Sequence, residues 1–256
     1  MDTVIQDNHL HNCSKFGVWL DWMAQGTMVL GNLVHDTSLC TIFTEVDHGP
    51  VTMANNIFLA PENGLCHNSA GNAYAHNLIT GVVANQGPDA RQTPSLVPHE
   101  TDIVAVVRAV NGDHRMYNNH LVAPAAFAAF DRDFLPCAGS GNVYTGAGNG
   151  GPSSFETGAL VDAAFNAGVA LTEEAGGIWM LQYATDSAWA THQTRALVDT
   201  ALLGSANITR QPYTLPSGAP LVIDVDYFGK ARDQANPFPG PFEAAGAVKV
   251  QVWPKP

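Results

Sequence analysis

The sequence is poor in charged residues, and in basic residues above all. Asp, Glu, Lys and Arg make up 13% of its 256 residues, about half the share of an ordinary soluble domain. Only 11 Lys and Arg stand against 23 Asp and Glu, which gives a formal net charge of −12. Polyanion binding depends on clustered Lys and Arg, so the composition excludes nucleic acid as a partner. Side chains in so uncharged a chain must instead pack or hydrogen-bond in a regular array.

Long apolar runs and paired cysteines are also missing. No run approaches the roughly 20 apolar residues of a membrane-spanning helix, so we expect no membrane partner. Residues 1–4 lack the features of a signal peptide, which predicts a cytoplasmic location. The four cysteines form no CxxC pair and have no metal-ligand spacing, so we interpret them as free thiols and predict neither a metal site nor a cofactor. They are Cys13, Cys40, Cys66 and Cys137.

The chain contains a repeat in which an asparagine precedes short, β-prone apolar segments. The repeated asparagines are Asn8, Asn32, Asn56, Asn77 and Asn119, at spacings of 24, 24, 21 and 42 residues. The last spacing is either two coils or one coil with an insertion. A period in the low twenties fits a β-solenoid, whereas helical solenoids repeat at roughly 33 to 47 residues. Stacked Asn amides can also hydrogen-bond along such a structure. We therefore predict an all-β, right-handed parallel β-helix.

The repeat divides the chain into a regular and a less regular part. Residues 1–135 are predicted to form the coils that carry the active-site face. Residues 136–256 are predicted to hold a Gly-rich loop at 139–151, an irregular segment and a closing coil at 220–243 of the same β-helix. Because the repeat begins at the first residues, its first coil would expose an unpaired edge. We expect an upstream region of a longer protein, or a second copy in a homo-oligomer, to cover that end.

Two acidic residues occupy equivalent positions on neighbouring coils. Asp21 lies 13 residues after Asn8, and Glu45 lies 13 residues after Asn32. Stacked strands are about 4.8 Å apart, so the two carboxyl groups should lie roughly 5 Å from each other. Like charges placed opposite each other are destabilising, so the pair is either functional or a solvated pair of surface acids. This separation suits a retaining glycosidase, although spacing alone does not say which acid attacks and which protonates.

The segments that carry this pair resemble a known family. GVWLDWMAQG at 17–26 and IFTEVDHGP at 42–50, followed by NNIF at 55–58, are similar to the β-helix glycoside hydrolases of family 120, the β-xylosidases. The likeness covers residues 5–121 and the closing coil. It implies a retaining exo-β-xylosidase that acts on xylo-oligosaccharides, with Asp21 as nucleophile and Glu45 as acid/base. Such enzymes have a substantial N-terminal region that is absent here, so the resemblance is to their C-terminal portion.

Four residues near the pair are candidates for sugar binding, each with a structural alternative. Trp19 offers an aromatic platform for a sugar ring, or simply covers the flank of the coil. Asp47 is expected to point outward beside Glu45, as a sugar ligand or a plain surface acid. His48, in the turn that follows, either contacts the sugar or stabilises that turn. His67 lies 24 residues after Phe43, which would place it on the same outer face one coil further on.

A second group of candidates comes from the 42-residue spacing. A Pro-rich loop at 86–101 contains Arg91 and His99, and long loops of solenoids usually emerge on the binding face. Arg108 lies 11 residues before Asn119, as Asp21 and Glu45 do before their own asparagines. Its alternative is a surface Arg with no role. The remaining histidines scatter along turns and are not expected to form a metal set.

Two other functions remain open. A β-helix polysaccharide lyase would use Asp21 and Glu45 to bind calcium, but it needs a basic residue as catalyst and few lie near the pair. A noncatalytic carbohydrate-binding β-helix would bind sugar without either carboxylate. The partner predicted in all three cases is an oligosaccharide.

Overall fold

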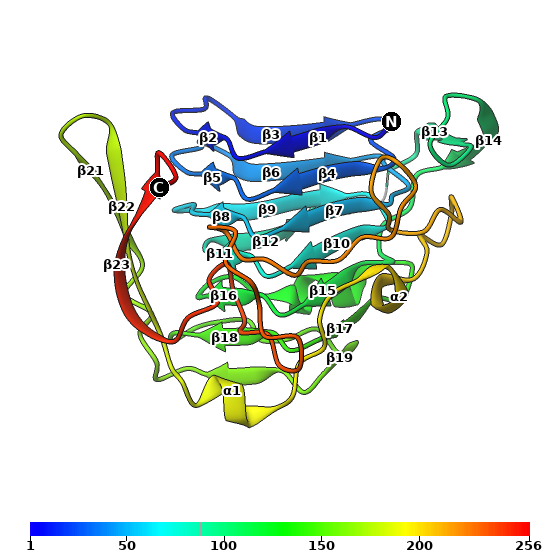
Figure 1. The fold of residues 1–256 in the computed structure, drawn as a ribbon. Helices are drawn as coiled ribbons and strands as arrows, with labels where there is room; N and C mark the ends of the chain where they lie inside the picture. The colour runs from blue at the N-terminus through cyan, green and yellow to red at the C-terminus, as the bar shows by residue number, and fades with distance from the viewer. Residues whose placement is uncertain (88) are drawn as a thin grey trace.

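The computed structural model describes residues 1–87 and 89–256, and it confirms the parallel β-helix (Figure 1). Successive coils stack from the N-terminal end, and three sheets run along the stack. The first sheet has seven parallel strands in the order β1 (Val4–Gln6), β4 (Thr27–Leu30), β7 (Val51–Ala54), β10 (Asn72–Ala75), β15 (Arg115–Tyr117), β17 (Ala138–Ser140) and β19 (Glu156–Thr157). The second has β2 (His9–Leu10), β5 (Leu33–Val34), β8 (Ile57–Phe58), β11 (Leu78–Ile79), β16 (His120–Val122), β18 (Val143–Thr145) and β20 (Leu160–Asp162).

The third sheet is shorter and covers only the N-terminal coils. Its strands are β3 (Phe16–Asp21), β6 (Cys40–Glu45), β9 (Asn63–Asn68) and β12 (Val82–Asn85). In the next coil its place is taken by the 3-10 helix η1 (Phe127–Arg132), which contacts β12. Apolar side chains from the three sheets and η1 fill one continuous interior. No helix among the described residues is long and apolar enough to cross a bilayer.

The repeated asparagines form one hydrogen-bonded ladder inside the stack. In each step the side-chain Oδ1 of one Asn accepts hydrogen bonds from the backbone N–H and the side-chain amide of the Asn before it, at 2.8–3.0 Å. The sequence predicted five of its members but missed Asn142, which continues the ladder from Asn119. Glu156 ends it by accepting from the Asn142 amide at 2.6 Å.

A left-handed residue precedes every Asn of the ladder. These residues are Asp7, Gly31, Asn55, His76, Asn118 and Gly141, with φ between 55° and 77°. Few side chains tolerate this conformation, and Gly, Asn, Asp and His are the ones that favour it. The residue before each Asn therefore makes the bend between strands, and the Asn supplies the side-chain amide of the ladder.

The 42-residue spacing is one coil with an insertion. Asn77 bonds directly to Asn119, so no coil lies between them. The insertion forms an antiparallel hairpin of β13 (Gln92–Leu96) and β14 (Ile103–Arg108), which projects from the stack in Figure 1.

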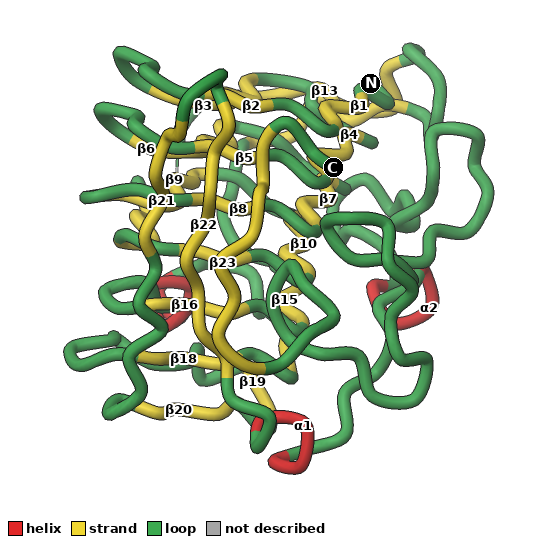
Figure 2. Tube along the Cα trace, turned by 60° about the vertical axis from the view of Figure 1, so that its left-hand side comes forward, coloured by secondary structure: helices red, strands yellow, loops and turns green. Residues whose placement is uncertain are grey.

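The coils continue further than the sequence indicated. The Gly-rich run at 139–151, predicted as a loop, contains β18 and most of β17, and the last coil ends with β20 at Asp162. Beyond it, β21 (Ala170–Glu174), β22 (Ile178–Thr185) and β23 (Gly246–Trp253) form an antiparallel sheet. These strands run across the edges of the coils instead of adding to them (Figure 2).

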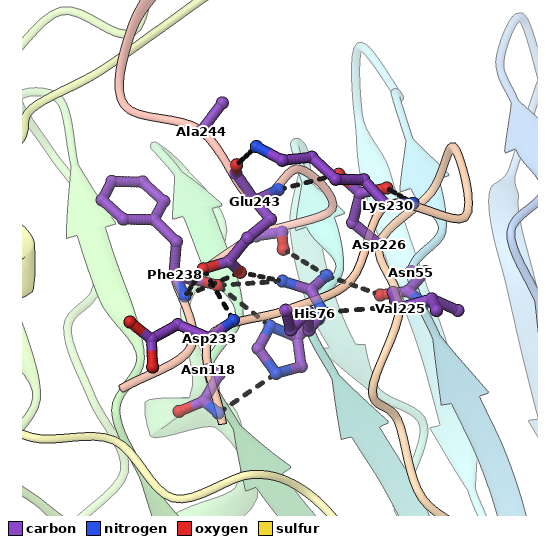
Figure 3. Close-up of polar contacts among 12 residues, drawn as sticks. Asn55, His76, Asn118, Val225, Asp226, Lys230, Asp233, Phe238, Glu243 and Ala244 are labelled. Atoms are coloured by element: carbon purple, nitrogen blue, oxygen red, sulfur yellow. Dashed lines mark hydrogen bonds and ion pairs between the residues drawn. The ribbon is translucent and has the colours of Figure 1, made fainter. Parts of the chain in front are cut away.

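The segment at 220–243, predicted as a closing coil, is an external strap. It follows the short helices α1 (Trp189–His192) and α2 (Thr200–Leu203) and lies along the outside of the stack (Figures 1 and 3). The buried Arg232 guanidinium donates to Asn55 Oδ1 at 2.7 Å and to Glu243 Oε2 at 3.1 Å. His76 Nδ1 is hydrogen-bonded to the Phe238 carbonyl at 3.1 Å. Asn55 and His76 belong to successive coils, so the strap connects them through their left-handed turns.

Two cysteines are not free. Cys40 of β6 and Cys66 of β9 form a disulfide with a Cα–Cα distance of 6.1 Å. The interpretation of all four as free thiols is therefore wrong for this pair and holds for Cys13 and Cys137.

Candidate active site

Asp21 and Glu45 end two adjacent strands of the third sheet. The strands are parallel, and their register pairs Asp21 with Glu45 and Trp19 with Phe43. The predicted placement on neighbouring coils is therefore confirmed. Strand spacing of about 4.8 Å keeps the two backbone positions close, and residues of the same parity point to the same face. Leu20, between Trp19 and Asp21, and Thr44, between Phe43 and Glu45, point the other way and are buried in the interior.

Glu45 is the more contacted of the two carboxylates. Its Oε2 accepts a hydrogen bond from Trp19 Nε1 at 3.0 Å, and its Oε1 forms an ion pair with Arg91 Nη2. Arg91 lies just before β13 and is held in turn by Asp89, whose Oδ1 and Oδ2 accept from its Nε and Nη2 at 3.0 and 2.8 Å. The insertion, predicted to emerge on the binding face, thus places the Arg91 cation on Glu45. The Glu45 side chain is 14% exposed and that of Arg91 40%.

Asp21 is exposed and has a different electrostatic setting. Partial desolvation, followed by the charge of Glu45, raises its pKa above the usual range, while Arg91 opposes the shift. The two acids therefore differ in setting: among the described residues Glu45 carries an ion pair, whereas Asp21 carries none and has the raised pKa. A raised pKa is typical of the proton donor, so this setting by itself does not assign Asp21 as the nucleophile.

Asp47 is buried beneath the pair, which contradicts its predicted outward orientation. Val46 adopts φ +48°, and this left-handed residue breaks the alternation of the strand. Asp47 Oδ1 accepts from the Ala24 backbone at 2.8 Å, and its Oδ2 has no hydrogen-bond partner among the described residues. Burial, reinforced by Asp21 and Glu45, raises the pKa of Asp47 well above its usual range.

An aromatic surface lies beside the pair. Trp19 is 52% exposed and stacks on Phe43, with ring centroids 6.2 Å apart and 16° between the planes. Phe16 packs against both rings at 5.2 and 5.1 Å. Trp22 is exposed, because its φ of +48° turns the chain after Asp21.

His48 and His99, both predicted to bind sugar, have structural contacts instead. Buried His48 is hydrogen-bonded through Nε2 to the carbonyls of Thr93 and Val107, both at 3.2 Å, and so attaches the hairpin to the coil. His99 lies with its Nδ1 3.2 Å from an Asp2 carboxylate oxygen, away from the pair.

The spacing of Arg108 from Asn119 suggested a place on the same sheet as Asp21 and Glu45, but Arg108 does not lie on that sheet. It belongs to β14 and pairs with Gln92 across the hairpin. Counting back from Asn119 fails because the residues before the coil are part of the insertion.

His67 points into the interior, which contradicts its predicted place on the outer face. The register pairs Phe43 with Cys66 and Thr44 with His67, so the spacing between these coils is 23 residues and not 24. A slip of one residue moves a side chain to the opposite face of a sheet. The outer neighbour of Glu45 on β9 is Asn68.

The histidines are more clustered than the sequence suggested. His9, His11 and His35 stack on one another at the first two coils, with centroids 4.4–5.3 Å apart. His67 and His114 meet inside the β-helix near Asp133. Both groups have the composition of a metal site, and neither was anticipated.

Sequence reasoning also missed Asp89 and Phe16. Asp89 stands two residues before Arg91, and this close acidic–basic spacing in the loop was the signal available for their ion pair. Phe16 lies three residues before Trp19 on the same strand, but nothing in the sequence indicated their contact.

Comparison with solved structures finds a strong likeness over nearly the whole chain. A structure described as the complex of XylC with xylose matches with a TM-score of 0.88 and 27% sequence identity. The match covers 99% of this chain and 43% of the XylC chain, so the chain spans less than half the length of that protein. No protein-family model and no curated protein matches the sequence.

Proposed function

We propose that this chain is a retaining glycoside hydrolase that removes xylose from the ends of β-xylo-oligosaccharides. The observation that carries the proposal is the direct pairing of Asp21 with Glu45 on adjacent parallel strands. Retaining enzymes hold their two carboxyl groups about 5–5.5 Å apart, close to the spacing of neighbouring strands, whereas inverting enzymes need a wider gap for water. The fold shared with XylC, whose structure is described as a complex with xylose, supports the choice of sugar.

In the proposed reaction, Asp21 attacks the anomeric carbon and Glu45 donates a proton to the leaving oxygen. The C–O bond to the leaving group breaks as the bond to Asp21 forms, which gives a covalent glycosyl-enzyme. Glu45, now a carboxylate, takes a proton from water as the water displaces Asp21. Two inversions restore the original anomeric configuration.

The Arg91 ion pair bears directly on these roles. In this structure the Arg91 guanidinium engages Glu45 Oε1. In the proposal, the entering sugar separates Arg91 from Glu45, and Asp89 keeps the released guanidinium at the edge of the site. The exposed face of Trp19 would then stack on the sugar ring.

The decisive experiment is chemical rescue with azide on an aryl β-xyloside, within a panel of aryl glycosides. We expect Glu45→Ala to accumulate the glycosyl-enzyme, and azide to restore turnover by releasing a β-xylosyl azide. For Asp21→Ala, azide takes the place of the lost nucleophile and forms the α-azide. If the two variants exchange these products, the roles are reversed.

The same panel separates the other two functions. A polysaccharide lyase would form unsaturated products that absorb in the ultraviolet when given uronate polymers. A noncatalytic β-helix would show no turnover on any sugar and would bind xylo-oligosaccharides equally well in Asp21→Ala and Glu45→Ala. Either result overturns the proposal.

A further inference from the structure

Three ligand-type side chains converge inside the β-helix, behind the sheet that carries Asp21 and Glu45. His67 lies on β9, His114 just before β15, and Asp133 just after η1. His114 Nε2 lies 3.3 Å from His67 Nδ1 and 3.2 Å from Asp133 Oδ2. The three residues therefore each offer a ligand atom to the same small volume.

Two of the three ligand separations match the edges of a zinc coordination tetrahedron, and the third is within 4.8 Å. Zinc–nitrogen bonds of about 2.0–2.1 Å and similar zinc–oxygen bonds place neighbouring ligand atoms about 3.3 Å apart in a tetrahedron. The two measured separations, 3.3 and 3.2 Å, agree with that edge. Two imidazoles and a carboxylate are also a known ligand set for zinc, with water in the fourth position.

The carboxylate is oriented by a second layer of residues. Asp133 Oδ1 accepts hydrogen bonds from the side-chain amides of Asn85 and Asn111, at 2.5 and 2.9 Å. These bonds leave Asp133 Oδ2 directed at the imidazoles and without a hydrogen-bond partner among the described residues. Carboxylates that bind metals are held in this way by their outer partners.

Burial makes the convergence costly without a cation. The side chains of His114 and Asp133 are 0% exposed, and His67 is equally buried. Neutral imidazoles bind metals through a ring-nitrogen lone pair, and each of these two rings directs one nitrogen toward the shared volume. A dication would compensate the buried carboxylate and use both lone pairs.

Packing holds the two imidazole rings in place. The Phe130 ring lies 4.7 Å from the His67 ring and 4.5 Å from the His114 ring. Asp133 also contributes to the wall of a surface pocket together with Asn111 and Phe134, although its carboxylate is closed to solvent.

We propose that His67, His114 and Asp133 bind one divalent transition-metal ion, zinc by preference, as a structural site inside the β-helix. The ion would join β9 to the coil that begins after the insertion. It does not depend on the proposed glycosidase activity, because the three residues face the interior and not the carboxylate pair.

The test measures zinc content and zinc-dependent melting of the full chain, expressed and refolded with and without zinc. We expect one tightly bound zinc per chain. At free zinc about 100-fold above the dissociation constant, the midpoint of thermal unfolding should rise by about 5–10 °C. Cobalt in place of zinc should give the visible absorption of a tetrahedral site.

Variants assign the site. Asp133→Asn keeps an oxygen that can accept hydrogen bonds from Asn85 and Asn111, but it removes the anionic ligand. His114→Gln removes an imidazole. Both should lose the zinc and the melting shift. The double variant His9→Gln/His11→Gln is the matched control, because it removes the separate histidine group at the partly exposed first coil.

Two results would overturn the proposal. One is that refolded wild-type protein holds no zinc and shows no melting shift, which would make the trio a hydrogen-bonded cluster only. The other is that zinc is lost in the His9/His11 variant and kept in Asp133→Asn. Should His114→Gln fail to fold, Asp133→Asn and the cobalt spectrum still decide the question.

Discussion

The sheet formed by β3, β6, β9 and β12 has two faces that differ in chemistry although they share every strand. The outer face carries Asp21, Glu45 and the aromatic side chains beside them, within reach of solvent and of the hairpin. The inner face carries Leu20, Thr44 and His67, and it contributes to a closed interior. Side chains alternate between these faces along each strand, so register alone decides which chemistry a residue can serve.

This contrast teaches that the two faces obey different constraints. On the outer face, Glu45 is paired with Arg91 of the insertion, and a rearrangement of that ion pair changes little of the packing. On the inner face, each polar side chain must find a partner within the interior, because an unsatisfied buried polar group is expensive. Changes to the two faces should therefore separate function from stability.

The largest stability difference is expected between two aromatic residues. Phe130→Ala removes a fully buried ring from the interior and should destabilise the fold by about 3–5 kcal/mol. Trp19→Ala removes a half-exposed ring from the outer face and should cost less than about 1 kcal/mol. Urea unfolding midpoints measure both. Equal losses would mean that the outer aromatic surface is part of the core.

Asp47 follows β6 and is buried beneath the carboxylate pair. Asp47→Asn should therefore change the pH dependence of stability. Its pKa is raised in the folded protein, so the unfolded chain loses the proton first as pH rises. The free energy of unfolding should therefore fall from about pH 4 upward, by about 1.4 kcal/mol for each unit between the two pKa values. The asparagine variant should remove that slope and be more stable than wild type at pH 7.

Unfolding curves between pH 4 and pH 8 check this expectation. Glu62→Gln is the matched control, because it removes one negative charge from an exposed position. A wild-type slope that persists in Asp47→Asn would show that other groups cause it.

The smallest effect on stability is expected at Arg91. Its ion pairs with Glu45 and Asp89 lie at the surface, so Arg91→Ala should change the free energy of unfolding by less than about 1 kcal/mol. Under the proposed reaction the sugar no longer has to displace a cation, so KM for an aryl xyloside should fall by less than about tenfold, or about 1.4 kcal/mol. Steady-state kinetics measures the change, with Arg91→Lys as the control that keeps the charge. A rise in KM would indicate instead that Arg91 holds the sugar.

The sequence contained enough to predict the β-helix and the neighbouring carboxylates. The Asn repeat predicted the ladder because each amide must meet its counterpart on the next coil, and the register of Asp21 and Glu45 follows from two equal spacings. Asn142 was missed because it lies within the Gly-rich run at 139–151, which reads as a loop, although Gly141 before it supplies the same left-handed turn as Gly31.

The face, register and partners of other residues could not be predicted from their spacing in the sequence. His67 changed faces because one coil is a residue shorter on that strand, and Asp47 turned inward because Val46 is left-handed. Arg91 reached Glu45 through a hairpin whose length fixes no register with the coils. The external strap at 220–243 mimics a coil in composition, but its partners are turn residues such as Asn55 and His76.

The Asn ladder gives the molecule a modular character. Its steps join coils separated by 21 to 42 residues without change in hydrogen-bond length, so the stack tolerates very different loop sizes between fixed points. Chain can be added or exchanged where the hairpin now emerges, next to the carboxylates, while the scaffold beneath stays constant. A fold with this property is suited to the grafting of new loops, and through them to the evolution of new sugar preferences.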